Sequence, residues 1–130
     1  MIGTLPLLAL VIIAYNLIVF LTGWTMQTLL FSVTLVSGAV WSVDIGSVLL
    51  FFGLILLFVE LISATRTGAS TIINHALSML VLLIALVEFV VLPQFGNSLF
   101  FLLVVLVLLD VIAGFSVTIT SARRDFTIGE

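Results

Sequence analysis

Two long apolar runs, residues 72–92 and 98–119, constrain this chain more than any other feature of its sequence. As helices rising 1.5 Å per residue, both are long enough to cross the ~30 Å hydrocarbon core of a bilayer. Both runs also carry ionisable side chains where hydrocarbon is expected, His75 and Glu88 in the first and Asp110 in the second. A centrally placed Asp costs about 2.5–3.5 kcal/mol on membrane-insertion scales. These groups therefore need partners: each other, a neighbouring helix, water or another protein.

The composition supports a membrane location for the whole chain. Of its 130 residues, 64% are hydrophobic and only 7% are charged, whereas roughly a quarter of the residues in soluble domains are charged. We therefore interpret the chain as an integral membrane protein. The absence of cysteine excludes disulfides and thiol nucleophiles, and a net charge of −3 provides no basic face for nucleic acid.

The fold class predicted is an all-α integral membrane protein, a four-transmembrane-helix bundle forming a single domain over residues 1–130. The predicted spans are residues 4–21, 43–65, 70–92 and 98–121, and residues 122–130 form a cytoplasmic tail. The first span lacks a positively charged region before it, so we interpret it as a retained helix rather than a cleaved signal peptide. Asp44 is expected to cap the second span.

A short β-hairpin outside the cytoplasm is predicted between the first two spans, over residues 29–43. This stretch is rich in β-branched and aromatic residues and contains a Ser37-Gly38 pair, which indicates a two-residue turn. Strand edges are not tolerated in hydrocarbon, so the hairpin should lie at or beyond the interface, with Trp24 and Trp41 as interface anchors. The alternatives are an irregular interfacial loop and a short re-entrant helix.

The arginines predict the orientation. Arg66 follows the second span, and Arg123 and Arg124 follow the fourth, so all three fall on one side of the membrane. By the positive-inside rule this side is cytoplasmic, and both termini lie there.

The polar residues within the spans are the candidate functional residues: Asn16, Glu60, His75, Glu88 and Asp110. We expect a hydrogen bond between Glu60 and His75, extended to Arg66, which either joins two helices or titrates near neutral pH. We expect Glu88 to reach the interface, the hairpin backbone or Trp41. Asp110 is expected either to contact Asn16 or to face an ion, a ligand or another subunit.

No catalytic motif, metal-ligand cluster or cofactor-binding loop is present in the sequence. One histidine and scattered acids form a weak ligand set for a metal. We therefore expect no enzymatic activity, no cofactor and no bound metal.

The chain resembles small four-helix inner-membrane proteins of bacteria, a family without an established activity. The resemblance rests on the layout of the whole chain, on LFVELISATRTGAST…NHALS, and on the ending LLDVIAGFSVTITSARRDF. It implies a multi-pass protein of the bacterial inner (cytoplasmic) membrane. The chain is less similar to four-helix small multidrug transporters, whose essential Glu lies in the first helix, where this chain offers only Asn16.

The expected function is structural or accessory. The protein would contact membrane lipids and act by association, as a homo-oligomer or as a small subunit of a larger membrane complex. The alternative is a small oligomeric ion- or proton-coupled transporter or channel that uses the intramembrane acids.

Overall fold

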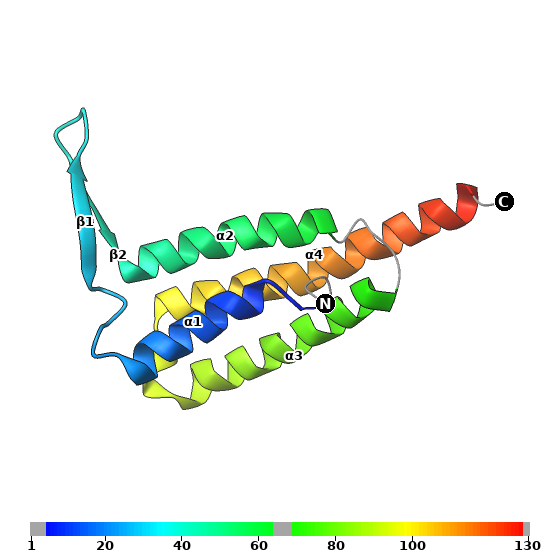
Figure 1. Ribbon diagram of the computed structural model, residues 1–130, viewed down its shortest axis with the longest axis horizontal. Helices are drawn as coiled ribbons and strands as arrows, with labels where there is room; N and C mark the ends of the chain where they lie inside the picture. Colours follow the sequence, from blue (N-terminus) through cyan, green and yellow to red (C-terminus); the bar gives the residue numbers. More distant parts are fainter. Residues whose placement is uncertain (1–4, 64–68, 129–130) are drawn as a thin grey trace.

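The computed structural model describes residues 5–63 and 69–128, which form four helices and one β-hairpin (Figure 1). The mostly helical fold and the hairpin between the first two helices agree with the prediction. The elements are α1 (Leu8–Leu21), β1 (Leu29–Thr34), β2 (Val40–Asp44), α2 (Ile45–Ser63), α3 (Ala69–Val91), the single 3-10 turn η2 (Pro93–Phe95) and α4 (Ser98–Ile128).

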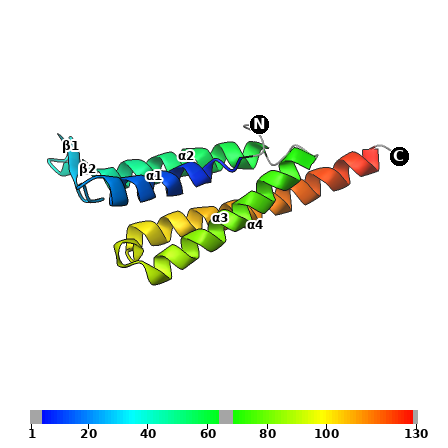
Figure 2. The same cartoon turned by 60° about the horizontal axis from the view of Figure 1, so that its bottom comes forward.

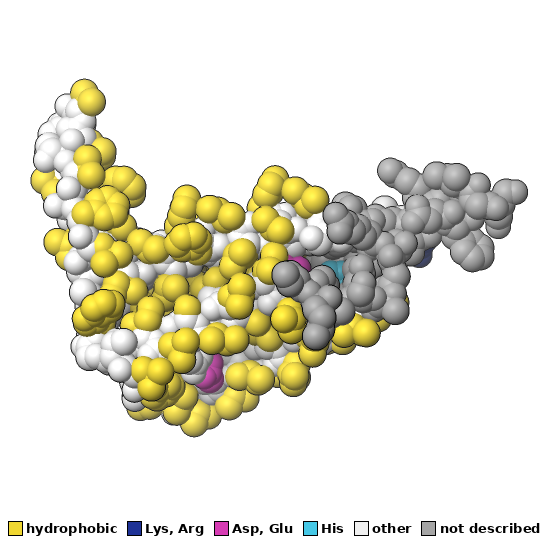
Figure 3. Space-filling model, viewed as in Figure 1, with side chains coloured by type: hydrophobic (Ala, Val, Ile, Leu, Met, Phe, Trp, Pro, Cys, Tyr) yellow, Lys and Arg dark blue, Asp and Glu magenta, His cyan; other side chains and the backbone are white. Residues whose placement is uncertain are grey.

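Three of the helices are long and apolar enough to cross a membrane, over Ile45–Ser63, Ile72–Val91 and Ser98–Ser116. Their outward faces are covered with hydrophobic side chains, and Figure 3 shows this surface along the bundle. Such a surface is stable in contact with lipid tails and unfavourable in water.

The first predicted span, residues 4–21, is shorter in the structure than expected. Its helix α1 begins only at Leu8 and has 14 residues, or about 21 Å at 1.5 Å per residue. The opposite difference occurs at the other end of the chain, where α4 continues through most of the predicted tail and reaches 31 residues. No Gly or Pro lies between Phe115 and Ile128 to end it.

Helix α4 lies between α2 and α3 and packs against both (Figure 1). Turned by 60°, the bundle shows α1 beside α2 and α3 beside α4 (Figure 2). The predicted bond between Glu60 and His75 requires α2 and α3 to be direct neighbours, but α2 packs mainly on α4, which runs in the same direction.

Two glycines explain why α2 prefers α4. A Cβ atom at Gly46 would lie 2.5 Å from Leu99 Cδ2, and one at Gly53 would lie 2.8 Å from Leu106 Cδ1. Both pairs are separated by seven residues along their helices, so the leucines of α4 insert where α2 has no side chains. Small residues at such spacing allow close packing of helices in membranes.

The hairpin has a longer loop than predicted. Leu35 N donates to Ala39 O over 2.8 Å, and Gly38 N donates to Leu35 O over 2.9 Å, which leaves a three-residue loop. Gly38 has a φ of 92°, and a glycine with positive φ commonly ends loops of this length. The prediction of a hairpin is confirmed, but its loop has three residues instead of the predicted two.

The hairpin joins α2 through the predicted cap. The Oδ1 atom of Asp44 accepts a hydrogen bond from Ser47 N over 2.8 Å, which confirms Asp44 as the cap of α2. The hairpin itself stands crosswise to the helices at one end of the bundle (Figure 1).

Candidate functional site

Five buried polar side chains gather inside the bundle and form the candidate site. Each is at most 7% exposed, and α2, α3 and α4 all contribute to the group. We call this group the polar cluster; its members are Glu60, Asn74, His75, Ser78 and Asp110.

Asp110 of α4 is joined to α3 through Ser78. The distance from Ser78 Oγ to Asp110 Oδ2 is 3.2 Å, and the distance from the same hydroxyl to the backbone oxygen of Asn74 is 3.0 Å. The second carboxyl oxygen of Asp110, Oδ1, is buried and has no hydrogen-bond partner among the described residues. A buried oxygen without a partner is uncommon and is often found at functional sites.

Glu60 of α2 is joined to the beginning of α1. Its Oε1 atom accepts a hydrogen bond from the backbone N–H of Leu7, and Asn74 Nδ2 donates to the backbone oxygen of Leu5 over 2.9 Å. The first N–H groups of a helix have no partner within the helix and attract negative charge. Glu60 therefore acts as a cap for α1 that is supplied by another helix.

Glu60 and Asp110 also interact electrostatically with each other. Both carboxyl groups are buried, at 3% and 1% exposure. Two negative charges in such a place are unfavourable unless cations or protons compensate them.

His75 packs against the part of α4 that follows Asp110. Its ring lies 5.0 Å from that of Phe115, measured between centroids. A Cβ atom at Gly114 would lie 2.8 Å from His75 Cε1, so only glycine leaves space for the imidazole.

Helical periodicity brings the cluster together. On α3, His75 and Ser78 share a face with the buried Leu82 and Ala85, and on α4 Asp110 continues the face of Leu103 and Val107. On α2, Glu60 follows Gly46 and Gly53 at intervals of seven residues, so it faces α4. These spacings are visible in the sequence, and Ser78, which the sequence analysis missed, could have been found three residues after His75 on the apolar face.

The structure replaces three predicted contacts. Glu60 bonds to Leu7 rather than His75, because α4 lies between α2 and α3. The expected contact between Asp110 and Asn16 is wrong, because Asp110 bonds to Ser78. The amide of Asn16 instead donates to the backbone oxygen of Ile12 over 2.8 Å and to Glu88 Oε1 over 3.3 Å. Glu88 therefore joins α3 to α1, and this contact replaces the predicted ones to the hairpin or Trp41.

The remaining predicted residues lie near the ends of the bundle. Trp24 and Trp41 are 61% and 55% exposed, on the connection after α1 and on the hairpin. Arg66 lies outside the described residues. Arg123 is exposed on the last part of α4, and Arg124 follows it in the same helix.

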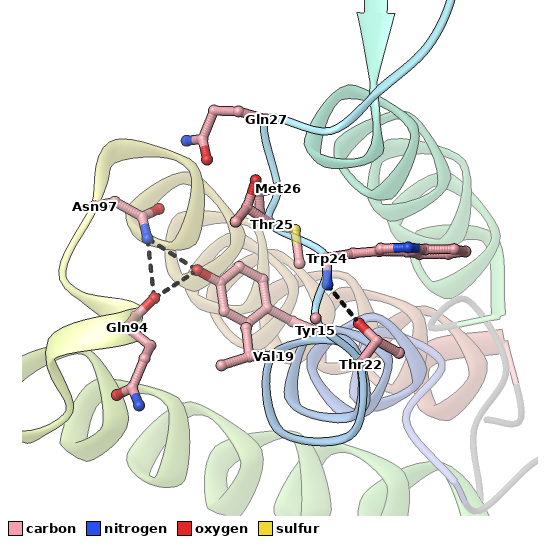
Figure 4. Close-up of a pocket in the computed structure, with 10 residues that line it drawn as sticks. Tyr15, Val19, Thr22, Trp24, Thr25, Met26, Gln27, Gln94 and Asn97 are labelled. Atoms are coloured by element: carbon pink, nitrogen blue, oxygen red, sulfur yellow. Dashed lines mark hydrogen bonds between the residues drawn. The ribbon is translucent and has the colours of Figure 1, made fainter.

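A second polar feature lies at the hairpin end, around Tyr15. Its hydroxyl donates to Gln94 O and accepts a hydrogen bond from Asn97 Nδ2, both over 2.9 Å (Figure 4). A hollow of about 380 Å³ adjoins these residues, and the indole of Trp24 points away from Tyr15. Asn97 Oδ1 also accepts from Phe100 N, which caps α4. These bonds explain the position of Tyr15 as a structural link between α1 and the start of α4.

The polar cluster offers oxygen acceptors, a hydroxyl and an imidazole inside a bundle in which three helices are long and apolar enough to cross a membrane. Among the described residues, no group of three or more His, Cys, Asp or Glu side chains could hold a metal ion. The chemistry that these residues support directly is hydrogen bonding and the binding of protons.

Comparison of the chain with models of known protein families, with curated proteins and with solved structures finds no match.

Proposed function

We propose that this chain is a small structural or accessory integral membrane protein that acts by association, as a homo-oligomer or as a subunit of a larger membrane complex. The observation that carries the proposal is the hairpin, which leaves the bundle and pairs only with itself among the described residues. Every residue of β1 is exposed. A two-stranded ribbon is marginally stable by itself, so a partner for it is favourable.

The hairpin has one apolar and one hydroxyl-bearing face. In its register Val33 lies opposite Trp41 and Ser32 lies opposite Ser42, so aromatic and aliphatic side chains alternate with hydroxyl groups. Hydrophobic side chains gather mainly on the side of the hairpin that faces along the helices (Figure 3). This arrangement supports a hairpin that rests on the membrane surface with its apolar face toward the lipid.

The free edge of β1 is the surface that remains for a protein partner. Residues 29–36 contain no charged residue and no proline, the two devices that commonly protect an exposed edge from pairing. The partner that fits best is a second copy of this chain. The hairpin lies crosswise to the helices, so a two-fold axis along the membrane normal would place two β1 strands antiparallel at the same depth.

The proposal includes a membrane topology for the four helices. We place α1, together with the residues before it, as a fourth crossing of the membrane, with both termini and the three arginines on the cytoplasmic side. The resemblance described above supports the inner membrane of a bacterium as the location.

A second candidate is a small oligomeric ion- or proton-coupled transporter or channel. The observation that favours it is the convergence of Glu60, His75 and Asp110, on three helices, in one buried cluster. In proteoliposomes, Asp110→Asn should then abolish an ion- or proton-dependent flux and leave assembly intact. Flux that persists in this variant would exclude the candidate.

Cross-linking in native membranes tests the proposed association. The chain has no cysteine, so one cysteine can be introduced at each residue of β1 in turn without background. We expect a cross-linked dimer from cysteines near the middle of β1, because paired strands bring Cα atoms within disulfide range. The matched control is Ser42→Cys, which lies opposite Ser32 on the other strand and should not cross-link.

Native mass spectrometry of the gently extracted protein provides the second measurement. A multiple of 14.0 kDa supports the homo-oligomer, and a larger mixed mass supports a subunit of a larger complex. Cross-linking from Ser42 alone would overturn the assignment to the β1 edge. A monomer without cross-links would overturn association altogether.

A further inference from the structure

The two hydrogen bonds made by the Ser78 hydroxyl group need two hydrogens, and the hydroxyl group supplies only one. The Ser78 hydroxyl lies 3.0 Å from the backbone oxygen of Asn74 and 3.2 Å from Asp110 Oδ2. A serine hydroxyl carries one hydrogen, and a backbone carbonyl can only accept. If the hydrogen is donated to the nearer oxygen, that of Asn74, then Asp110 must supply the hydrogen for its own bond to Ser78.

The other oxygen of Asp110 supports the same assignment. Oδ1 is buried and has no hydrogen-bond partner among the described residues. For an ionised carboxylate this would leave half of a negative charge unsolvated inside the protein, which is strongly unfavourable. In a neutral carboxylic acid the same atom is an uncharged carbonyl oxygen, and the free-energy cost of burying it without a hydrogen-bond partner is much smaller.

Within residues 5–63 and 69–128, the side chains that interact with Asp110 are Ser78 and Glu60, and neither carries a positive charge. Glu60 interacts with it from α2, and from α3 His75 lies one turn before Ser78. The chain contains no lysine, and Arg123, exposed, is 13 positions further along α4. Glu60 already caps the positive end of α1 at Leu7, so Glu60 is the better place for the negative charge.

We propose that Asp110 is a proton-binding site within the membrane-spanning bundle. The proton resides on Oδ2 and is donated to Ser78 Oγ, whose own hydrogen is donated to the backbone oxygen of Asn74. On release, the proton leaves Oδ2, and the Ser78 hydroxyl rotates to donate to the new carboxylate. This inference goes beyond the proposed association and does not depend on it.

Infrared spectroscopy of the full-length protein in lipid bilayers at neutral pH tests the proposal. A protonated carboxyl group has a carbonyl stretch that is separate from the amide bands. We expect this band in the wild-type protein, its loss in Asp110→Asn, and its retention in the matched control Glu88→Gln. Absence of the band in the wild-type protein, or its persistence in Asp110→Asn, would overturn the proposal.

A second variant keeps the test decisive if Asp110→Asn does not fold. Ser78→Ala removes the acceptor of the proposed hydrogen bond and leaves the acid in place. We expect the carbonyl band to shift to higher frequency, as it does when a carboxyl group loses its hydrogen bond. An ionised Asp110 that merely shares the serine hydrogen would give no such band in either protein, and that outcome would also refute the proposal.

Discussion

The carboxyl group of Glu60, near the end of α2, accepts a hydrogen bond from the backbone N–H of Leu7, 53 residues earlier in the chain. This contact caps the beginning of α1 with a carboxyl group that is buried inside the bundle. The position of α1 in the bundle therefore depends on one side chain of another helix.

Replacement of Glu60 by Ala should destabilise the start of α1. The variant leaves the Leu7 N–H without its acceptor, and we expect a loss of about 1–3 kcal/mol, the usual effect of an unsatisfied buried donor. Thermal unfolding in detergent measures the loss, and hydrogen exchange at residues 5–10 locates it. Glu60→Gln keeps an oxygen acceptor and should have a smaller effect; equal effects from the two variants would show that the hydrogen bond is unimportant.

Gly114→Ala should disturb the packing of His75. The added Cβ atom would lie 2.8 Å from Cε1 and 3.1 Å from Nδ1 of the imidazole, and overpacking of this kind costs about 1–3 kcal/mol. The second substitution His75→Ala should restore most of the lost stability, because it removes the clash. Additive losses in the double variant would contradict this account.

Gly46→Ala should be more harmful than Gly53→Ala, although both glycines face α4. At Gly53 the only contact under 3 Å is with the end of the Leu106 side chain, which can rotate away. At Gly46 a new methyl group would also meet the backbone oxygen of Met26 at 3.2 Å, which cannot move as easily. Unfolding midpoints of the two variants measure the difference, with Gly23→Ala as the control, since a Cβ atom there meets nothing within 4 Å.

Tyr15→Phe should cost about 1–3 kcal/mol, because it removes two hydrogen bonds that are each typically worth about 0.5–1.5 kcal/mol. The ring keeps its packing against Phe95 and Phe100, with centroids 4.9 Å and 4.8 Å away, and only the bonds to Gln94 and Asn97 are lost. Tyr15→Ala removes the ring as well and should cost several times more. Similar unfolding midpoints for the two variants would show that the aromatic packing contributes little.

The sequence predicted those features that depend on the residues of a single helix or hairpin. The apolar runs predicted the three long helices, and the Ser37-Gly38 pair predicted a hairpin, because length, turn residues and alternation are local properties. Asp44 was identified as a cap for the same reason.

Contacts between helices were predictable only in part. Asn16 was one predicted partner of Asp110, but the positions of polar residues along their own helices do not say which helices touch. The seven-residue spacing of Gly46, Gly53 and Glu60 carries that information, because it marks the face of α2 against which α4 packs. The bond between Glu60 and Leu7 had no comparable signal, since any backbone N–H can serve as the donor.

The central place of α4 has a consequence for how the protein is made. Helix α4 is synthesised last, yet it separates α2 from α3 and supplies Asp110 to Ser78 and Gly114 to His75. Until α4 has been synthesised, the polar side chains of α2 and α3 lack their final neighbours. Among the four described helices, the packing of α2 and α3 can therefore be completed only after α4 has been synthesised.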